Sequence, residues 1–237
     1  MNKIILLCFP YAGGSSAAYL SWKKYLDSNI ELCPVELSGR GKRINDPLYE
    51  CVEDVINDIF PKFENIIANS SYALYGHSMG CLLAYEFARK IRACGMKEPL
   101  HAFLSGRFPP FIESKTKKYL LTDSEFIKDI AAFGGMNREI LNNRELMSFF
   151  LPIIRADYRI VELYRHVDDG FRFNCDLTIL NGKYDDLIIE NEVLRWRECT
   201  NKNCSFYEFY GGHFFINEYK ERVIGIINEE LEKVSMT

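Results

Sequence analysis

A serine flanked by two glycines, Ser78 in the segment GHSMG, stands in a setting that suggests chemistry. The apolar run 72–75 precedes it, and a stretch with helical periodicity, 79–93, follows it, so Ser78 is expected at a strand-to-helix turn. Gly76 and Gly80 allow the strand and the helix to approach closely, and the helix amino terminus favours negative charge beside the serine. The pattern predicts a nucleophile; a turn without a catalytic role is the alternative.

A serine hydroxyl needs a general base, and the sequence holds four histidines. His77 adjoins Ser78 and is expected to point away from it, whereas His101 opens a strand at the opposite end of the sheet. His166 falls in the long segment without a strand, 107–167, and is expected at the surface or an interface. His213 follows a strand through two glycines, at the carboxyl end where ligands of open α/β sheets bind. His213 is the predicted base; a histidine that only caps a loop is the alternative.

The acid that orients the histidine is expected between Ser78 and His213 in the chain, directly after a strand. The segment DLTILNGKYDDL supplies Asp185 and Asp186 at such a place. One of the two carboxylates is predicted to accept a hydrogen bond from the histidine Nδ1 and to stabilise the imidazolium. Asp185 is favoured, and the choice between the two stays open.

Two N–H groups are needed to stabilise an oxyanion. The backbone of Met79, directly after the serine, is one predicted donor. The segment CFPYAGGSS leaves the first strand near the expected site, and its Ala12 can turn its N–H inward because flexible glycines follow. A glycine-rich connection without a catalytic role is the alternative for this loop.

These residues require a scaffold in which strands and helices alternate, as in an α/β fold with a mostly parallel sheet. Several strand candidates are continuous apolar runs, which is typical of strands buried on both faces. The expected strands are 3–9, 31–37, 72–75, 101–105, 176–181 and 205–210, and the expected helices are 17–27, 52–68, 79–93, 190–197 and 218–234. The alternation stops at about 107–167, where helical patterns at 123–133 and 137–165 predict a lid within a single domain, 1–237.

Composition sets broad limits on the class of protein. The 237 residues are 48% hydrophobic and 26% charged, which is typical of a globular domain with a large core. A formal net charge of −4 gives no overall attraction to nucleic acid or to an anionic membrane. The apolar run after Lys3 is too short for a secretory signal. Without an export signal, we expect a cytoplasmic protein whose eight cysteines are reduced thiols. No C-x-x-C pair occurs among them, so we expect no metal site, and we expect a monomer.

Taken together, the motifs resemble those of type II thioesterases, members of the α/β-hydrolase superfamily that accompany non-ribosomal peptide and polyketide synthetases. The resemblance runs through nearly the whole chain, and Ser38 departs from it by standing where proline is common. The motifs that carry it are FPYAGGSS, ELSGRGKR, GHSMG, SGRFPP, LPIIRADYRIVELYR, NGKYDD and GGHFF.

The resemblance implies hydrolysis of acyl groups from the phosphopantetheine thiol of acyl or peptidyl carrier proteins. The enzyme itself then needs no cofactor, because the substrate carries the phosphopantetheine. A general medium-chain acyl thioesterase or a small-molecule carboxylesterase is the alternative, and a non-catalytic relative is a third reading. Apolar lid residues are expected to line an acyl channel in part, although core packing is their commoner fate: Phe108, Phe111, Phe149, Phe150 and Leu151.

Carrier proteins are usually acidic near their phosphopantetheine, so an enzyme of net negative charge needs a local basic patch to attract them. Two clusters are candidates: Lys115, Lys117 and Lys118 at the start of the lid, and Arg40, Lys42 and Arg43 in the loop LSGRGKR. This loop lacks the P-loop pattern. A solvated loop is its default interpretation, and a place near the mouth of the site is the alternative.

Overall fold

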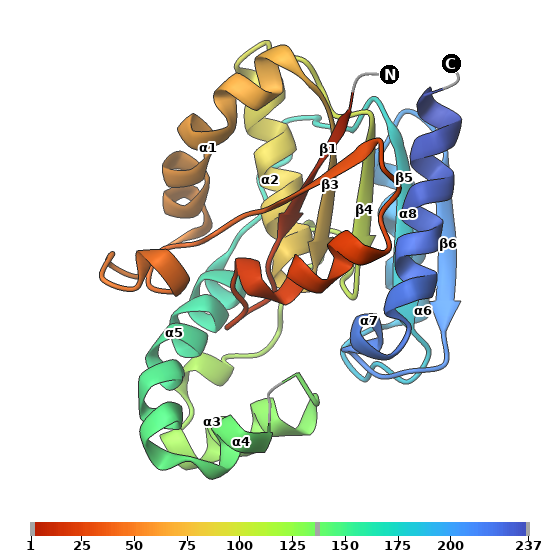
Figure 1. The fold of residues 1–237 in the computed structure, drawn as a ribbon. Coiled ribbons are helices and arrows are strands. Elements are labelled where there is room, and N and C mark those ends of the chain that lie inside the picture. Colours follow the sequence, from red (N-terminus) through yellow and green to blue (C-terminus); the bar gives the residue numbers. More distant parts are fainter. Residues whose placement is uncertain (1–2, 136–137, 236–237) are drawn as a thin grey trace.

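A six-stranded parallel sheet forms the centre of the protein in the computed structural model, which describes residues 3–135 and 138–235 (Figure 1). The strand order is β2-β1-β3-β4-β5-β6, and every neighbouring pair is parallel. This arrangement confirms the predicted α/β architecture. The strands are β1 Ile4–Phe9, β2 Ile30–Pro34, β3 Ser71–His77, β4 His101–Ser105, β5 Asp176–Gly182 and β6 Cys204–Phe209.

Helices cover both faces of the sheet because alternate strand residues are apolar on each side. Leu7 and Phe9 of β1 pack into one core with α1 (Val52–Asn69) and α2 (Met79–Ala93). The intervening Leu6 and Cys8 pack into a second core on the opposite face. That second core includes the 3₁₀-helix η1 (Ser16–Lys24), α7 (Phe215–Glu218) and α8 (Lys220–Ser235). The first core also takes in α6 (Glu190–Val193) and η4 (Leu194–Cys199).

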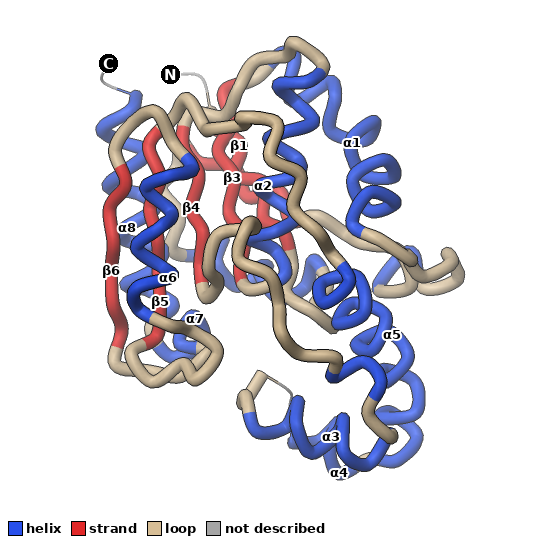
Figure 2. The backbone as a smooth tube through the Cα atoms, turned by 180° about the vertical axis from the view of Figure 1, so that it is seen from behind, coloured by secondary structure: helices blue, strands red, loops and turns tan. Residues whose placement is uncertain are grey.

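The helices of segment 107–167 lie beyond the carboxyl ends of the strands, below the sheet in Figure 1 and again in the rear view of Figure 2. They are η3 (Lys118–Leu120), α3 (Asp123–Ala132), α4 (Arg138–Asn142) and α5 (Arg144–Leu163). No strand occurs among the described residues of this segment, as the sequence predicted. Their small core joins α3 to α5 and consists of Phe126, Ile130, Met147, Leu151 and Ile154.

Some predicted boundaries are wrong for reasons of local pairing. The second strand ends at Pro34, and its last ladder contact is the Val35 N–H bond to Cys8 O, because β1 ends at Phe9 and no partner continues beyond it. The helix predicted at 17–27 is a 3₁₀-helix, and that predicted at 190–197 divides into α6 and η4. Residue 137, where a lid helix was predicted to begin, lies outside the described residues. None of the described helices is long and apolar enough to cross a bilayer.

Candidate active site

Ser78 lies at the junction of β3 and α2 with a strained backbone. Its φ of 55° and ψ of −116° make it the one non-glycine residue with positive φ in the described part of the chain. A side chain at Gly76 would collide with the carbonyl of Gly80, and a side chain at Gly80 would collide with the carbonyl of Phe9. The turn therefore needs both glycines, and it holds the serine at the amino terminus of α2, where the helix dipole favours negative charge.

His213 and Asp185 form a buried pair at the carboxyl ends of the neighbouring strands β6 and β5. The histidine Nδ1 lies 2.6 Å from Oδ2 of Asp185, and the aspartate side chain is fully enclosed. Its other oxygen, Oδ1, accepts a hydrogen bond of 3.0 Å from the Leu187 N–H. A carboxylate at this place favours the imidazole tautomer in which Nδ1–H is the donor and Nε2 is the acceptor. Asp186 is exposed and lines the neighbouring cavity.

One cavity of about 600 Å³ brings several of the predicted site residues together. Its wall includes Ser78 and His213, and also both predicted oxyanion donors, Ala12 and Met79, with Phe108 from the lid segment. These residues come from four different strand ends, which parallel topology places at one edge of the sheet. The cavity therefore brings a serine hydroxyl, an imidazole and two backbone amides to one place.

The other histidines have structural partners. His77 is buried, with Nδ1 2.9 Å from Ser105 Oγ, and burial lowers its pKa well below the ordinary histidine value. His101 is buried at the start of β4, with Nε2 2.8 Å from Thr178 Oγ1. His166 is partly buried, with Nδ1 3.4 Å from the Tyr164 hydroxyl. His213 is thus the histidine that combines a carboxylate partner with a place on the cavity wall.

The loop after β1 lines the cavity, and two of its N–H groups are engaged elsewhere. Gly13 donates its N–H to Asp157 Oδ2 at 2.7 Å, and Gly14 donates to Tyr11 O at 2.8 Å. Within residues 3–135 and 138–235 we find no acceptor for the Ala12 N–H. Met79 is the first residue of α2, so its N–H has no acceptor within the helix. Ala12 and Met79 therefore carry backbone N–H groups on the cavity wall that are available to a bound molecule.

Comparison with known proteins identifies the family. The family model for the thioesterase domain matches residues 4–231 of the chain. The chain belongs to the thioesterase family. This thioesterase is 33% identical over 233 residues to the gramicidin S biosynthesis protein GrsT of Aneurinibacillus migulanus, covering 98% of this chain and 90% of that protein.

A second relative and a solved structure support the assignment. The medium-chain S-acyl fatty acid synthase thioesterase of Homo sapiens is 30% identical over 217 residues, covering 89% of this chain and 80% of that protein. The crystal structure of ClbQ from the colibactin NRPS/PKS pathway has a TM-score of 0.95, with 34% identity and 99% coverage of both chains. The resemblance to type II thioesterases is thereby confirmed.

The predicted channel residues of this thioesterase divide into two groups. Leu151 packs into the small core between α3 and α5, whereas Phe108 and Phe150 line the cavity. Phe111 and Phe149 do not: Phe111 packs beneath the Arg195 guanidinium, 4.5 Å from the ring centre, and Phe149 is 50% exposed. The reason is helical geometry, because Phe149 lies on the outer face of α5 and its neighbour Phe150 faces the cavity. Sequence reasoning missed several other apolar wall residues, which the periodicity of α3 and α5 could have indicated: Ile130, Phe133, Ile154 and Tyr158.

The two basic clusters also differ. Lys115 lines the cavity and is exposed. Lys117 is also exposed, whereas Lys118 forms an ion pair with Asp129 at 2.8 Å. In the second cluster, interpreting the loop as solvated is wrong for Arg40, which is 4% exposed and bonded to Asp157.

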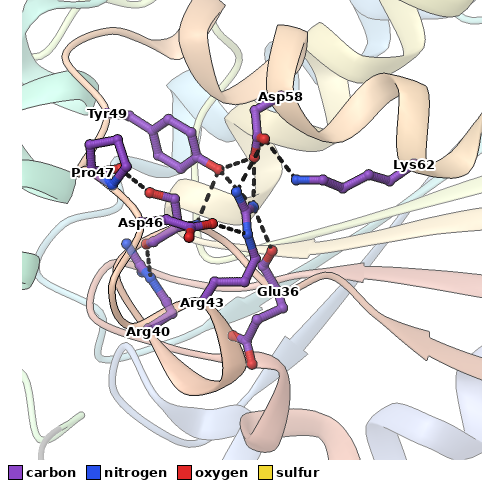
Figure 3. Close-up of polar contacts among 9 residues, drawn as sticks. Glu36, Arg40, Arg43, Asp46, Pro47, Tyr49, Asp58 and Lys62 are labelled. Atoms are coloured by element: carbon purple, nitrogen blue, oxygen red, sulfur yellow. Dashed lines mark hydrogen bonds and ion pairs between the residues drawn. The ribbon is translucent and has the colours of Figure 1, made fainter.

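Arg43 of the same loop is also neutralised, because it pairs with Asp58 at 2.6 Å and with Asp46 at 2.8 Å (Figure 3). Lys42 is left as the exposed member of this cluster. We find no group of three or more His, Cys, Asp or Glu side chains placed to hold a metal ion in the described chain.

Proposed function

We propose that this thioesterase hydrolyses acyl groups from the phosphopantetheine thiol of carrier proteins and so clears misprimed or stalled intermediates from a natural-product assembly line. The observation that carries the proposal is the buried His213–Asp185 pair on the same cavity as a strained serine at a helix amino terminus. The relatives in gramicidin S biosynthesis and the colibactin pathway support the substrate class.

Each residue has a role in two half-reactions. Ser78 Oγ attacks the thioester carbonyl while His213 Nε2 accepts its proton, and Asp185 stabilises the imidazolium that forms. The N–H groups of Met79 and Ala12 stabilise the tetrahedral oxyanion. The imidazolium returns the proton to the departing thiol. Water, activated by His213, then attacks the acyl-serine and releases the acid.

The composition of the cavity wall supports the proposal that the acyl chain of the substrate binds next to segment 107–167. Phe108, Phe150 and Ile154 give this wall apolar surface, suited to the hydrocarbon part of an acyl chain. Lys115 lies at the same cavity, so it is placed to meet an acidic carrier protein whose phosphopantetheine arm enters there. The phosphopantetheine arm belongs to the substrate, and the proposed mechanism uses no other cofactor.

Ser78→Ala and His213→Ala test the mechanism. Each variant is expected to lose roughly 10³-fold or more in kcat on an acyl-carrier protein while its melting temperature stays near that of the wild type. A variant that keeps more than about a tenth of the wild-type rate contradicts the role given to that residue.

Free medium-chain acyl thioesters are the alternative substrates, favoured by similarity to the human medium-chain thioesterase. Steady-state rates on acyl-carrier protein, the matching acyl-coenzyme A and an oxygen ester distinguish the two functions. The proposed function predicts the highest kcat/KM on the carrier protein. Equal values for carrier protein and coenzyme A favour the alternative, and preference for the oxygen ester contradicts both.

A further inference from the structure

An ion pair buried outside the proposed catalytic residues joins two distant parts of the chain. Arg40, in the loop after β2, binds Asp157 in the middle of α5 through Nη1–Oδ2 at 2.7 Å and Nη2–Oδ1 at 2.8 Å. The two side chains are 4% and 2% exposed. Burying two charges is costly unless the pair is well aligned and its remaining polar groups are satisfied. The partners of the other hydrogen bonds that Arg40 and Asp157 form therefore indicate the role of the pair.

Two of the three remaining bonds go to the loop that holds Ala12. Asp157 Oδ2 accepts the Gly13 N–H at 2.7 Å, and Arg40 Nη1 donates to the Gly14 carbonyl at 3.0 Å. The Arg40 Nε donates to the Ser38 carbonyl at 3.1 Å, which fixes the arginine to its own loop. One ion pair thus holds both a donor and an acceptor of the oxyanion loop, residues 11–15.

These bonds orient successive peptide planes. Asp157 fixes the Ala12–Gly13 peptide, and Arg40 fixes the peptide that follows Gly14. Between them, the Gly14 N–H binds the Tyr11 carbonyl, which belongs to the same peptide plane as the Ala12 N–H. The direction of the proposed oxyanion donor therefore follows from the three bonds together.

The same contacts tie the oxyanion loop to the lid. Gly13 has φ of 76°, and a Cβ there would lie 2.7 Å from Ile154 Cγ1 of α5. Ile154 and Asp157 are three residues apart, so they lie on one face of that helix. A shift of α5 that breaks the Asp157 bond would free the Gly13 peptide and release the loop.

We propose that Arg40 and Asp157 are positioning residues that orient the Ala12 N–H and make this orientation depend on the place of α5. The proposal rests on the proposed function for its kinetic consequence. The pair neither touches the substrate nor transfers a proton; it acts through the backbone of residues 11–15. Its loss is expected to lower kcat more than it alters KM, because the oxyanion forms in the transition state and not in the bound substrate.

The matched comparison uses two double variants from the same loop. Arg40→Met/Asp157→Leu removes the positioning pair without leaving a buried unpaired charge, and such apolar replacements are often neutral for stability. Arg43→Met/Asp58→Leu removes the neighbouring pair, which joins the loop to α1 (Figure 3). Both are assayed on an acyl-carrier protein and examined by hydrogen–deuterium exchange of the peptide that covers residues 11–15.

We expect the first double variant to lose at least about tenfold in kcat with KM changed less than threefold, since one oxyanion donor contributes roughly 10²–10³ in rate. Exchange at residues 11–15 should become faster in this variant alone. The control should stay within about twofold of the wild-type kcat. Unchanged kcat and exchange in the first variant, or equal changes in both, would overturn the proposal.

Two single variants provide a test that does not depend on the folding of the double variant. Asp157→Asn keeps an oxygen that accepts the Gly13 N–H, whereas Asp157→Ala does not, so kcat and slow exchange should be retained better in the asparagine variant. Equal losses contradict the proposal. A wild-type enzyme without thioesterase activity would refute the proposed function, and the exchange comparison would still decide whether the pair orders the loop.

Discussion

The carboxylate of Asp185 and the imidazole of His213 meet at the ends of adjacent parallel strands, 2.6 Å apart and shielded from solvent. Asp186, the next residue, is exposed on the cavity wall. A turn of the backbone after β5 separates the two carboxylates, because Asp185 N–H bonds back to Gly182 O. The two neighbouring aspartates consequently differ in what they can do for the histidine.

The first prediction compares Asp185→Asn with Asp186→Asn. The first substitution is expected to lower kcat by about 10²-fold or more, because an amide neither favours the required tautomer nor stabilises the imidazolium. The second should stay within about threefold of the wild type. Single-turnover rates on one acyl-carrier protein provide the measurement, and thermal unfolding verifies that both variants are folded. A larger loss at position 186 would reverse the assignment of the acid.

The sequence was sufficient to predict the parts of the site that depend on local pattern. Ser78 lies within one short segment that contains the strand, the two glycines and the helix. The turn that positions the serine can therefore be predicted from local sequence. Asp185 and Asp186 could not be separated from sequence with certainty, because which carboxylate reaches the histidine depends on the turn between β5 and α6.

Long-range burial is where sequence reasoning failed. Arg40 stands in a glycine-spaced basic loop that looks solvated, and its partner Asp157 is 117 residues away in α5. No local periodicity connects them. Phe149 and Phe150 illustrate the same difficulty on a smaller scale, since adjacent residues of α5 face solvent and cavity respectively.

The second prediction concerns the acyl chain. Phe108→Ala should change the ratio of kcat/KM between short and long acyl chains, because Phe108 lines the cavity. Phe149→Ala is the matched control, since this ring is half exposed and lies off the cavity wall. A series of acyl thioesters from two to twelve or so carbons provides the measurement. A lowered melting temperature with unchanged chain-length ratios in Phe108→Ala would indicate packing alone.

The third prediction is a pH dependence of stability that involves His101. Burial lowers its pKa to about 4, an effect opposed in part by Glu230 and Asp176, and its Nδ1 has no hydrogen-bond partner in the described structure. The unfolded chain, with a histidine pKa near 6.5, binds more protons than the folded chain between these two values. Stability therefore rises with pH across this window and is lost as pH falls through it.

His101→Gln tests the assignment, because glutamine can still reach Thr178 but does not titrate. Urea unfolding at pH 7.5 and pH 5 should show that the wild type loses up to about 2 kcal/mol more than the variant on acidification, from roughly 1.36 kcal/mol for each pH unit. His77 has a lowered pKa in both proteins, so part of the acid loss persists. Identical losses in the two proteins would exclude His101 as a source of the dependence.

The fourth prediction concerns attraction of the carrier protein. Lys115 and Lys117 are exposed, and Lys115 lies on the cavity wall, whereas Lys118 is engaged by Asp129 and is left unchanged. Reversing both lysines in Lys115→Glu/Lys117→Glu should lower kcat/KM on acyl-carrier protein by about tenfold and leave an uncharged N-acetylcysteamine thioester nearly unaffected. The reason is that the carrier protein is acidic around its phosphopantetheine, so favourable encounter depends on local positive charge.

A charge-matched control and a salt series complete this experiment. Lys97→Glu/Lys202→Glu makes the same change in net charge at residues preceding β4 and β6, at the opposite end of the sheet from the cavity. It should keep most of the wild-type preference for carrier protein. In the wild type that preference should shrink as ionic strength rises past about 0.15 M, where the screening length is roughly 8 Å. Equal losses of kcat/KM on both substrates would indicate damage to segment 107–167. Equal losses in the two double variants would indicate a general effect of net charge. A preference for carrier protein that does not depend on salt would indicate an apolar docking surface.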